Sequence, residues 1–139
     1  MINEKANISV KGHVVMTKYD KDSNVIEVIE QDNAIDTAIA LEVFRRAFAD
    51  GDRVLDEIAV YETGPSLLMS KAIASKTYVS TNRVDFAVTY DESDFAGDMV
   101  QASLFCTDEG PFSTITFSTI SKTNVEKFGI VWSITLSIS

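Results

Sequence analysis

Three oxygen-bearing side chains in the segment 20–24 have the spacing of a calcium-binding loop. Asp20, Asp22 and Asn24 reproduce the first half of the D-x-[DN]-x-[DN] pattern, which supplies oxygen ligands to Ca²⁺. The second half departs from the pattern, because Val25 stands where a glycine is needed and Gln31 where a glutamate is needed. Extended segments flank the motif, and Asp and Asn favour tight turns. The segment is therefore predicted to be a polar hairpin turn instead of a metal site.

The stretch from Val84 to Ser121 is acidic and contains no lysine or arginine. Its seven carboxylates are Asp85, Asp91, Glu92, Asp94, Asp98, Asp108 and Glu109. One interpretation is an anionic patch that binds calcium, faces a basic partner or holds a catalytic carboxylate pair. The other is a pair of solvated loops, at 91–98 and 108–111, and it is favoured because charge runs in loops are common. Whether the loop 91–98 binds a cation stays open at this point.

The chain has one histidine, one cysteine and one tryptophan, which limits the remaining chemistry. His13 lies in a valine-rich segment and no G-x-S-x-G elbow surrounds any serine, so a structural histidine is expected instead of a catalytic triad. Cys106 follows two apolar residues and is expected to be buried. Trp132 alternates with apolar residues and is expected in the core. We therefore predict no catalytic, cofactor-binding or metal-binding residues, and no enzymatic activity.

The composition argues against several classes of partner. The 139 residues include 21 acidic and 12 basic side chains, for a formal net charge of −9. Nucleic acids and anionic membranes are bound by clustered cations, and the longest basic grouping here is Arg45–Arg46. No apolar run is long enough to span a bilayer, and no signal-peptide pattern is seen. We expect one domain over residues 1–139, with residues 1–7 as a flexible arm that becomes ordered against a neighbouring protein.

Alternating apolar residues predict a mainly β chain. A hairpin is expected from the segments 8–19 and 25–30, with a bulge or bend at Gly12. Further strands are expected at 54–61, 77–80, 83–90, 99–106, around 115–117 and at 130–138, whereas 67–74 is ambiguous between a helical turn and irregular chain. About eight strands in one domain indicate a β-sandwich or jelly roll. The last strand has the clearest alternation and is expected to be well paired.

One helix interrupts the strands. Apolar residues recur at helical spacing over residues 34–49, which predicts a helix laid over one edge of the sandwich. Asp32 or Asn33 is expected to cap its start, and Gly51 is expected to end it in the left-handed conformation.

The order of segments resembles small structural proteins of tailed bacteriophages. In these proteins a hairpin is followed by an Asn that opens a helix, a Gly-containing turn, an Arg-led strand, an E-x-G-L-F segment, an f-x-x-i-x-K-t stretch and a terminal strand with the pattern l-x-i-x-W-x-i-x-i. The similar segments are Gln31–Asp36, Ile58–Gly64, Arg83–Phe86, Ala102–Phe105, Thr116–Thr123 and Ile130–Leu136. Ser103 stands where the family has the glycine before Leu104.

The resemblance implies a non-enzymatic virion protein without cofactors that assembles with other virion proteins. We expect a homo-oligomeric capsid decoration protein, or else a neck or tail component, made in the host cytoplasm and located in the virion. The acidic composition is consistent with the outside of a capsid. The alternative is a carbohydrate- or receptor-binding β-sandwich, with exposed aromatics such as Tyr61, Tyr78 or Tyr90 and calcium in the acidic loop. A small hydrolase that uses Asp or Glu ranks below both.

Overall fold

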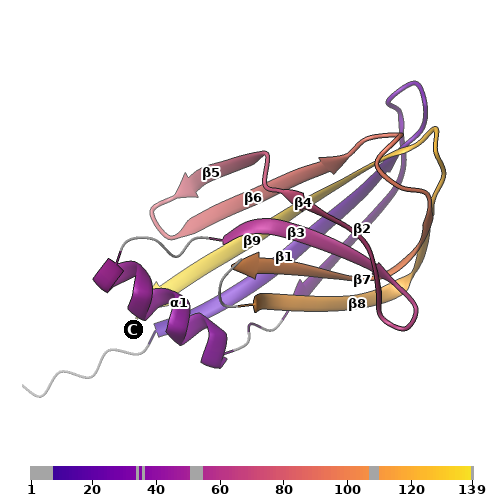
Figure 1. The fold of residues 1–139 in the computed structure, drawn as a ribbon. Helices are drawn as coiled ribbons and strands as arrows, with labels where there is room; N and C mark the ends of the chain where they lie inside the picture. Colours follow the sequence, from indigo (N-terminus) through magenta and orange to yellow (C-terminus); the bar gives the residue numbers. More distant parts are fainter. Residues whose placement is uncertain (1–7, 34, 36, 51–54, 107–109, 139) are drawn as a thin grey trace, which may run out of the picture.

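The computed structural model describes residues 8–33, 35, 37–50, 55–106 and 110–138. These form β1 (Ile8–Tyr19), β2 (Val25–Asn33), α1 (Thr37–Asp50), β3 (Leu55–Glu62), β4 (Ser66–Ala72), β5 (Ser75–Ser80), β6 (Arg83–Tyr90), β7 (Gly97–Cys106), β8 (Gly110–Lys122) and β9 (Lys127–Ile138). The strands build two antiparallel sheets that enclose a core, with α1 at one end (Figure 1). The predicted mainly β sandwich with one helix is confirmed. The described residues hold one strand more than expected, because the ambiguous segment contributes β4.

The two sheets have different sizes and orders. The larger sheet has the order β2-β1-β9-β6-β5, and the smaller has the order β4-β3-β7-β8. β9 lies in the middle of the larger sheet and pairs with β1 from Lys127 to Ile138 and with β6 along its other side. The expectation that this strand is well paired is confirmed.

The core lies between the two sheets and contains the inward-facing residues that the alternation predicted. Trp132 and Ile130 on β9 are fully buried, and Cys106 on β7 is 1% exposed. Tyr90 on β6 is also fully buried, and its hydroxyl donates a hydrogen bond of 2.6 Å to the main-chain oxygen of Ile58 on β3. The structural roles expected for Cys106 and Trp132 are thus confirmed.

The start of α1 differs from the prediction. Asp32 and Asn33 belong to β2, where they pair with His13 and Gly12 of β1, so neither occupies the predicted position at the start of the helix. The strand pairing of the hairpin extends through these two residues, so the helix begins only at Thr37. Gly51, expected at the other end, lies outside the described residues.

The helix is anchored to the smaller sheet. Phe44 meets Phe112 of β8 edge to face, with ring centroids 6.4 Å apart. Ile35, just before the helix, forms an isolated antiparallel bridge with Ser113 of the same strand. These contacts hold α1 against the β8 side of the sandwich, which matters for the cleft described below.

Gly12 does not mark a bulge. β1 pairs without interruption there, with Asn33 on one side and Ile134 on the other, and the irregularity in this hairpin lies between Lys18 and Tyr19. The Asn33 side chain occupies the space that a Cβ on residue 12 would need. The glycine is therefore explained by close packing, and the prediction of a bulge at this position was wrong.

Candidate functional site

The segment with calcium-loop spacing is a hairpin turn, as predicted. Oδ1 of Asp20 accepts hydrogen bonds from the main-chain N–H groups of Asp22 and Asn24, each at 2.9 Å. Ser23 adopts a left-handed conformation with φ of 64°. The N–H of Asn24 is the main cause that lowers the pKa of Asp20. The Asp20 carboxylate therefore satisfies the turn that closes the β1–β2 hairpin.

The acidic loop 91–98 is partly compensated by lysines from other strands, and Lys71 is hydrogen-bonded to Asp94. Nζ of Lys71 on β4 lies 2.5 Å from Asp94 and 3.7 Å from Asp91. This hydrogen bond lowers the pKa of Asp94 and raises the pKa of Lys71. In the part of the chain that the structure describes, no three His, Cys, Asp or Glu side chains are placed to hold a metal ion. Asp108 and Glu109 lie outside the described residues.

Lys122, which the sequence offered as the lysine of the f-x-x-i-x-K-t stretch, binds the main chain of the same loop. The residue is 2% exposed, and its ammonium donates to the main-chain oxygens of Glu92, Phe95 and Thr123 at 3.2, 2.7 and 3.2 Å. Burial lowers the pKa of Lys122, opposed by the carboxylates of the loop. The stretch gives the lysine no role of its own, so this arrangement was not predicted from the sequence.

His13 sits between two carboxylates of the neighbouring strand. Nδ1 lies 2.7 Å from Asp32, and Nε2 lies 3.6 Å from Glu30. Ser133 is opposite His13 in the sheet, but its hydroxyl accepts a hydrogen bond from Arg83, 3.2 Å away. Because both ring nitrogens face acids, the imidazole has no lone pair aimed at this serine. The imidazole is therefore held by two carboxylates of β2.

The three tyrosines considered for ligand stacking have different environments. Tyr90 is buried in the core, so the prediction that it is an exposed aromatic was wrong. Tyr61 on β3 is half-buried. Tyr78 on β5 is 83% exposed and is the tyrosine available to contact a ligand.

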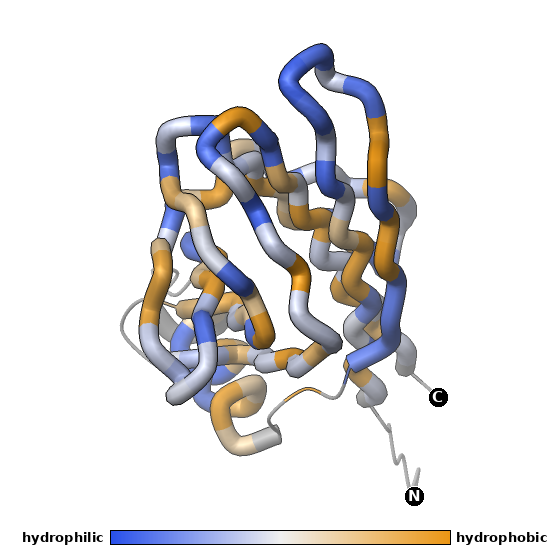
Figure 2. Tube along the Cα trace, turned by 90° about the vertical axis from the view of Figure 1, so that its right-hand side faces the viewer, coloured by the Kyte–Doolittle hydropathy of each residue, from blue (hydrophilic) through white to orange (hydrophobic). Residues whose placement is uncertain are grey.

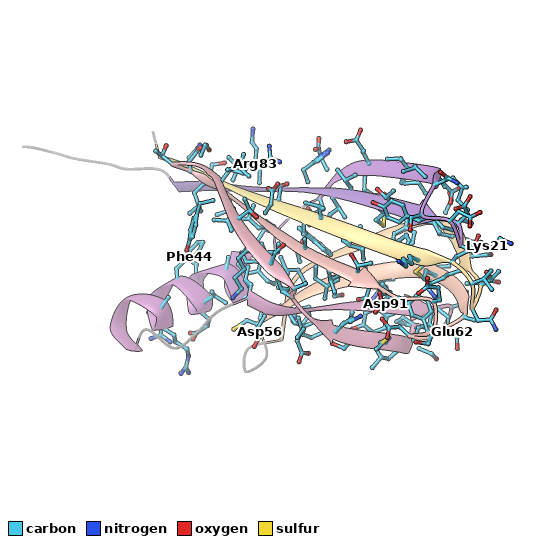
Figure 3. All side chains as sticks on the ribbon, turned by 90° about the horizontal axis from the view of Figure 1, so that it is seen from above. Lys21, Phe44, Asp56, Glu62, Arg83 and Asp91 are labelled. Carbon is cyan, nitrogen blue, oxygen red and sulfur yellow. The ribbon has the colours of Figure 1, made fainter. Side chains whose placement is uncertain are left out.

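An apolar cleft lies between α1 and the inner face of the larger sheet. Its volume is about 450 Å³. The lining consists of Val43, Phe44, Ala47, Leu55, Lys76, Tyr78, Ser80, Thr81, Asn82, Arg83, Val84, Phe86, Phe112, Ile134 and Leu136. Phe44 and Arg83 mark this end of the molecule in Figure 3, opposite the end that carries Lys21, Glu62 and Asp91. A volume of this size is in the range of small-molecule sites.

The β1–β2 hairpin presents a second candidate surface. Its tip stands clear of the neighbouring loops, with apolar residues on β2 at the outer edge (Figure 2). Val25, Ile26 and Val28 are 56%, 48% and 53% exposed. β2 ends the larger sheet, so one side of this strand has no neighbour in the sheet. Exposed edge strands with apolar side chains are ready to pair with another chain.

Comparison with known proteins gives no further guide to these surfaces. The chain matches no protein-family profile, no curated protein and no solved structure. None of the described helical residues forms a helix long and apolar enough to cross a membrane. The cleft below α1 and the exposed edge of β2 are the two surfaces on which a function can be proposed.

Proposed function

We propose that this chain is a non-enzymatic structural protein of a tailed-phage virion that acts by protein–protein assembly. A capsid decoration protein is the first assignment, and a neck or tail component is the second. The observation that carries the proposal is the exposed, apolar edge strand β2. The resemblance of the segment order to small virion proteins supports the same role.

The sequence of β2 lacks two of the features that protect edge strands, lysine and proline. Natural edges are usually blocked by lysine, proline or a covering segment, because a bare edge pairs with other chains. The other edge strands carry such residues: Lys71 in β4, Lys76 in β5 and Pro111 in β8. β2 reads VIEVIEQDN and has neither, and β8 lies beside its far end, where the Gln31 amide donates to the main-chain oxygen of Thr116 at 3.2 Å. We infer that its edge is covered in the assembled particle.

The charge of β2 indicates the kind of partner that covers it. Glu27, Glu30 and Asp32 give the strand three acidic side chains and no basic ones. Two copies of β2 side by side would bring like charges together, which destabilises strand pairing. A strand or surface with basic side chains complements this edge. The partner is therefore proposed to be a different virion protein with a basic contact surface.

Quantitative mass spectrometry of purified particles tests the proposal. Copies of this chain are counted relative to the major capsid protein. Copy numbers comparable with the capsid protein are expected for a decoration protein, and a few copies per particle would instead indicate a neck or tail component. Absence from well-purified particles would overturn the virion assignment.

One observation favours the second candidate function, a carbohydrate- or receptor-binding module: Tyr78 projects, 83% exposed, beside a cleft. A glycan screen and a thermal-stability measurement with and without CaCl₂ test it. We expect no stabilisation by calcium, because Lys71 already pairs with Asp94 at 2.5 Å and lies 3.7 Å from Asp91. A glycan or calcium that raises Tm would favour the binding module.

A further inference from the structure

We propose that the cleft below α1 binds a linear aliphatic anion, a fatty-acid-like amphiphile, with its chain in the cleft and its head group at Lys76. This inference goes beyond the assembly role and does not depend on it. The shape, the lining and the charge of the cleft each contribute to the argument.

The cleft exists because the helix covers only part of the sandwich end. α1 is held on the β8 side by Phe44 and Phe112, which leaves the inner face of β5 and β6 uncovered. All six residues of β5 are exposed. The space between the helix and these strands is the cleft of about 450 Å³, within the range that holds a small ligand.

The floor and walls of the cleft offer almost only carbon atoms. The floor comes from β6 and β9, and the walls come from α1 and the ends of β3 and β8. The apolar side chains are Val43, Phe44, Ala47, Leu55, Val84, Phe86, Phe112, Ile134 and Leu136. The polar side chains line one edge, from Lys76 and Tyr78 on β5 to the turn from Ser80 to Asn82 and Arg83 after it. An aliphatic chain buried here loses no hydrogen bond that the cleft would have to replace.

A peptide or a sugar fits this lining less well. Burial of an amide or a hydroxyl without a hydrogen-bond partner is unfavourable by several kcal/mol in an apolar environment. Partners are available along the β5 edge, from Lys76 and Tyr78 to the Ser80–Asn82 turn with Arg83 beside it, whereas the other lining side chains are apolar. The chemistry of the cleft therefore favours a ligand whose polar atoms are confined to one end.

Lys76 supplies a positive charge on the β5 edge of the cleft. In the β5–β6 pair Lys76 is opposite Phe86, and Tyr78 is opposite Val84. Residues paired in this way point to the same face of a sheet, so the lysine and the tyrosine overhang the apolar floor. An ammonium and a phenol hydroxyl at the mouth of an apolar cleft are complementary to a carboxylate or another singly charged oxyanion.

The other charges around the cleft do not compete with this head group. The lining contains no Asp or Glu. Arg83 alternates with inward-facing Val84, and its guanidinium binds Asp85 at 2.9 and 3.1 Å. Among the described residues Lys76 forms no ion pair. Its ammonium is therefore free to bind an anion.

Calorimetric titration with dodecanoate, below its micelle-forming concentration, tests the proposal on the full chain. We expect binding of one molecule per chain and a rise in Tm. Lys76 is exposed, so the variant Lys76→Met should fold normally. It is expected to weaken binding roughly tenfold, because one charge-assisted hydrogen bond to the head group is lost. Ala47→Trp, which fills the cleft, should abolish binding while circular dichroism shows the native fold.

Two controls separate this site from nonspecific adsorption. Lys11→Met removes a lysine that does not line the cleft and should leave the affinity unchanged. Dodecyltrimethylammonium has the same chain with a cationic head and should bind much more weakly. Failure of dodecanoate to bind, equal binding of the two amphiphiles, or unchanged binding in the Lys76→Met and Ala47→Trp variants would each overturn the proposal.

Discussion

The hydroxyl of Tyr90 on β6 donates a hydrogen bond of 2.6 Å to the main-chain oxygen of Ile58 on β3, so one side chain links the two sheets through the core. Both residues are fully buried. Burial raises the pKa of Tyr90, which keeps the phenol protonated as a donor.

Tyr90→Phe should therefore lower the free energy of unfolding by about 1–2 kcal/mol, because a buried carbonyl loses this donor. Urea denaturation measures the difference, with Tyr78→Phe as the control. Tyr78 is exposed, so its variant should unfold like the wild type. Equal stability of the Tyr90→Phe variant and the wild type would show that the inter-sheet bond contributes nothing.

Lys122 makes the second buried polar contribution to stability. Replacement by Met keeps the length of the side chain but removes the donor for three carbonyl oxygens. We expect a loss of about 2–4 kcal/mol in the free energy of unfolding. Lys127, whose Nζ lies 3.8 Å from Glu92 at the surface, is the matched control. Lys127→Met should change stability by less than about 0.5 kcal/mol, and similar effects of the two substitutions would contradict the structural role of Lys122.

Two glycines in neighbouring strands give opposite predictions. A methyl group on Gly12 would overlap the side-chain amide of Asn33, so Gly12→Ala should destabilise by about 1–3 kcal/mol. A methyl group on Gly129 would lie 3.6 Å from the Tyr19 ring, an ordinary contact. Gly129→Ala should be neutral or stabilising by up to about 1 kcal/mol, because it reduces the entropy of the unfolded chain. Thermal denaturation of both variants checks the contrast, and destabilisation by Gly129→Ala would contradict it.

The sandwich was predictable because its strands alternate between buried and exposed positions. Ile130, Trp132 and Ile134 recur every second residue, and this local pattern is the same one that the core requires. The helix forms where apolar residues recur every three or four positions, but the predicted start of the helix was wrong. Asp32 and Asn33 satisfy the local rule for a cap, and the pairing of β2 with β1 overrides that rule.

The cleft and the lysine contacts were not predictable, because they depend on residues far apart in the chain. Lys122 reaches carbonyls near residues 92 and 95, and Lys71 reaches Asp94, through strand pairings that no local pattern encodes. The acidic loop appeared uncompensated in the sequence for the same reason. The cleft results from the position of α1 on β8, which is fixed by the contact between Phe44 and Phe112 and by the bridge between Ile35 and Ser113.

His13 should make the stability depend on pH. The hydrogen bond with Asp32 is the main cause that raises the pKa of His13 above 6.5. The protonated form is thus stabilised in the folded state. Its contribution is complete below about 6.5 and is lost as the pH rises through the raised pKa.

His13→Gln should accordingly lower Tm more at about pH 5.5 than at about pH 8.5. Thermal denaturation across this range measures the difference between wild type and variant. Asp32→Asn removes the main partner and should reduce the same pH dependence. A difference between wild type and His13→Gln that stays constant with pH would exclude the imidazolium–carboxylate contact as its source.

The edge strand β2 provides the test of the proposed assembly surface at the level of single residues. Val28→Lys introduces the kind of side chain that blocks natural edges, at a position that is 53% exposed. Stability should change by less than about 0.5 kcal/mol, since the side chain is solvated in the isolated protein. Incorporation into particles, counted by mass spectrometry, should fall strongly, because a lysine both blocks strand addition and opposes a basic partner.

Val125, equally exposed at 53% but outside the strands, is the matched control. Normal incorporation of Val28→Lys, or equal loss with Val125→Lys, would remove β2 as the contact that binds this chain to the particle.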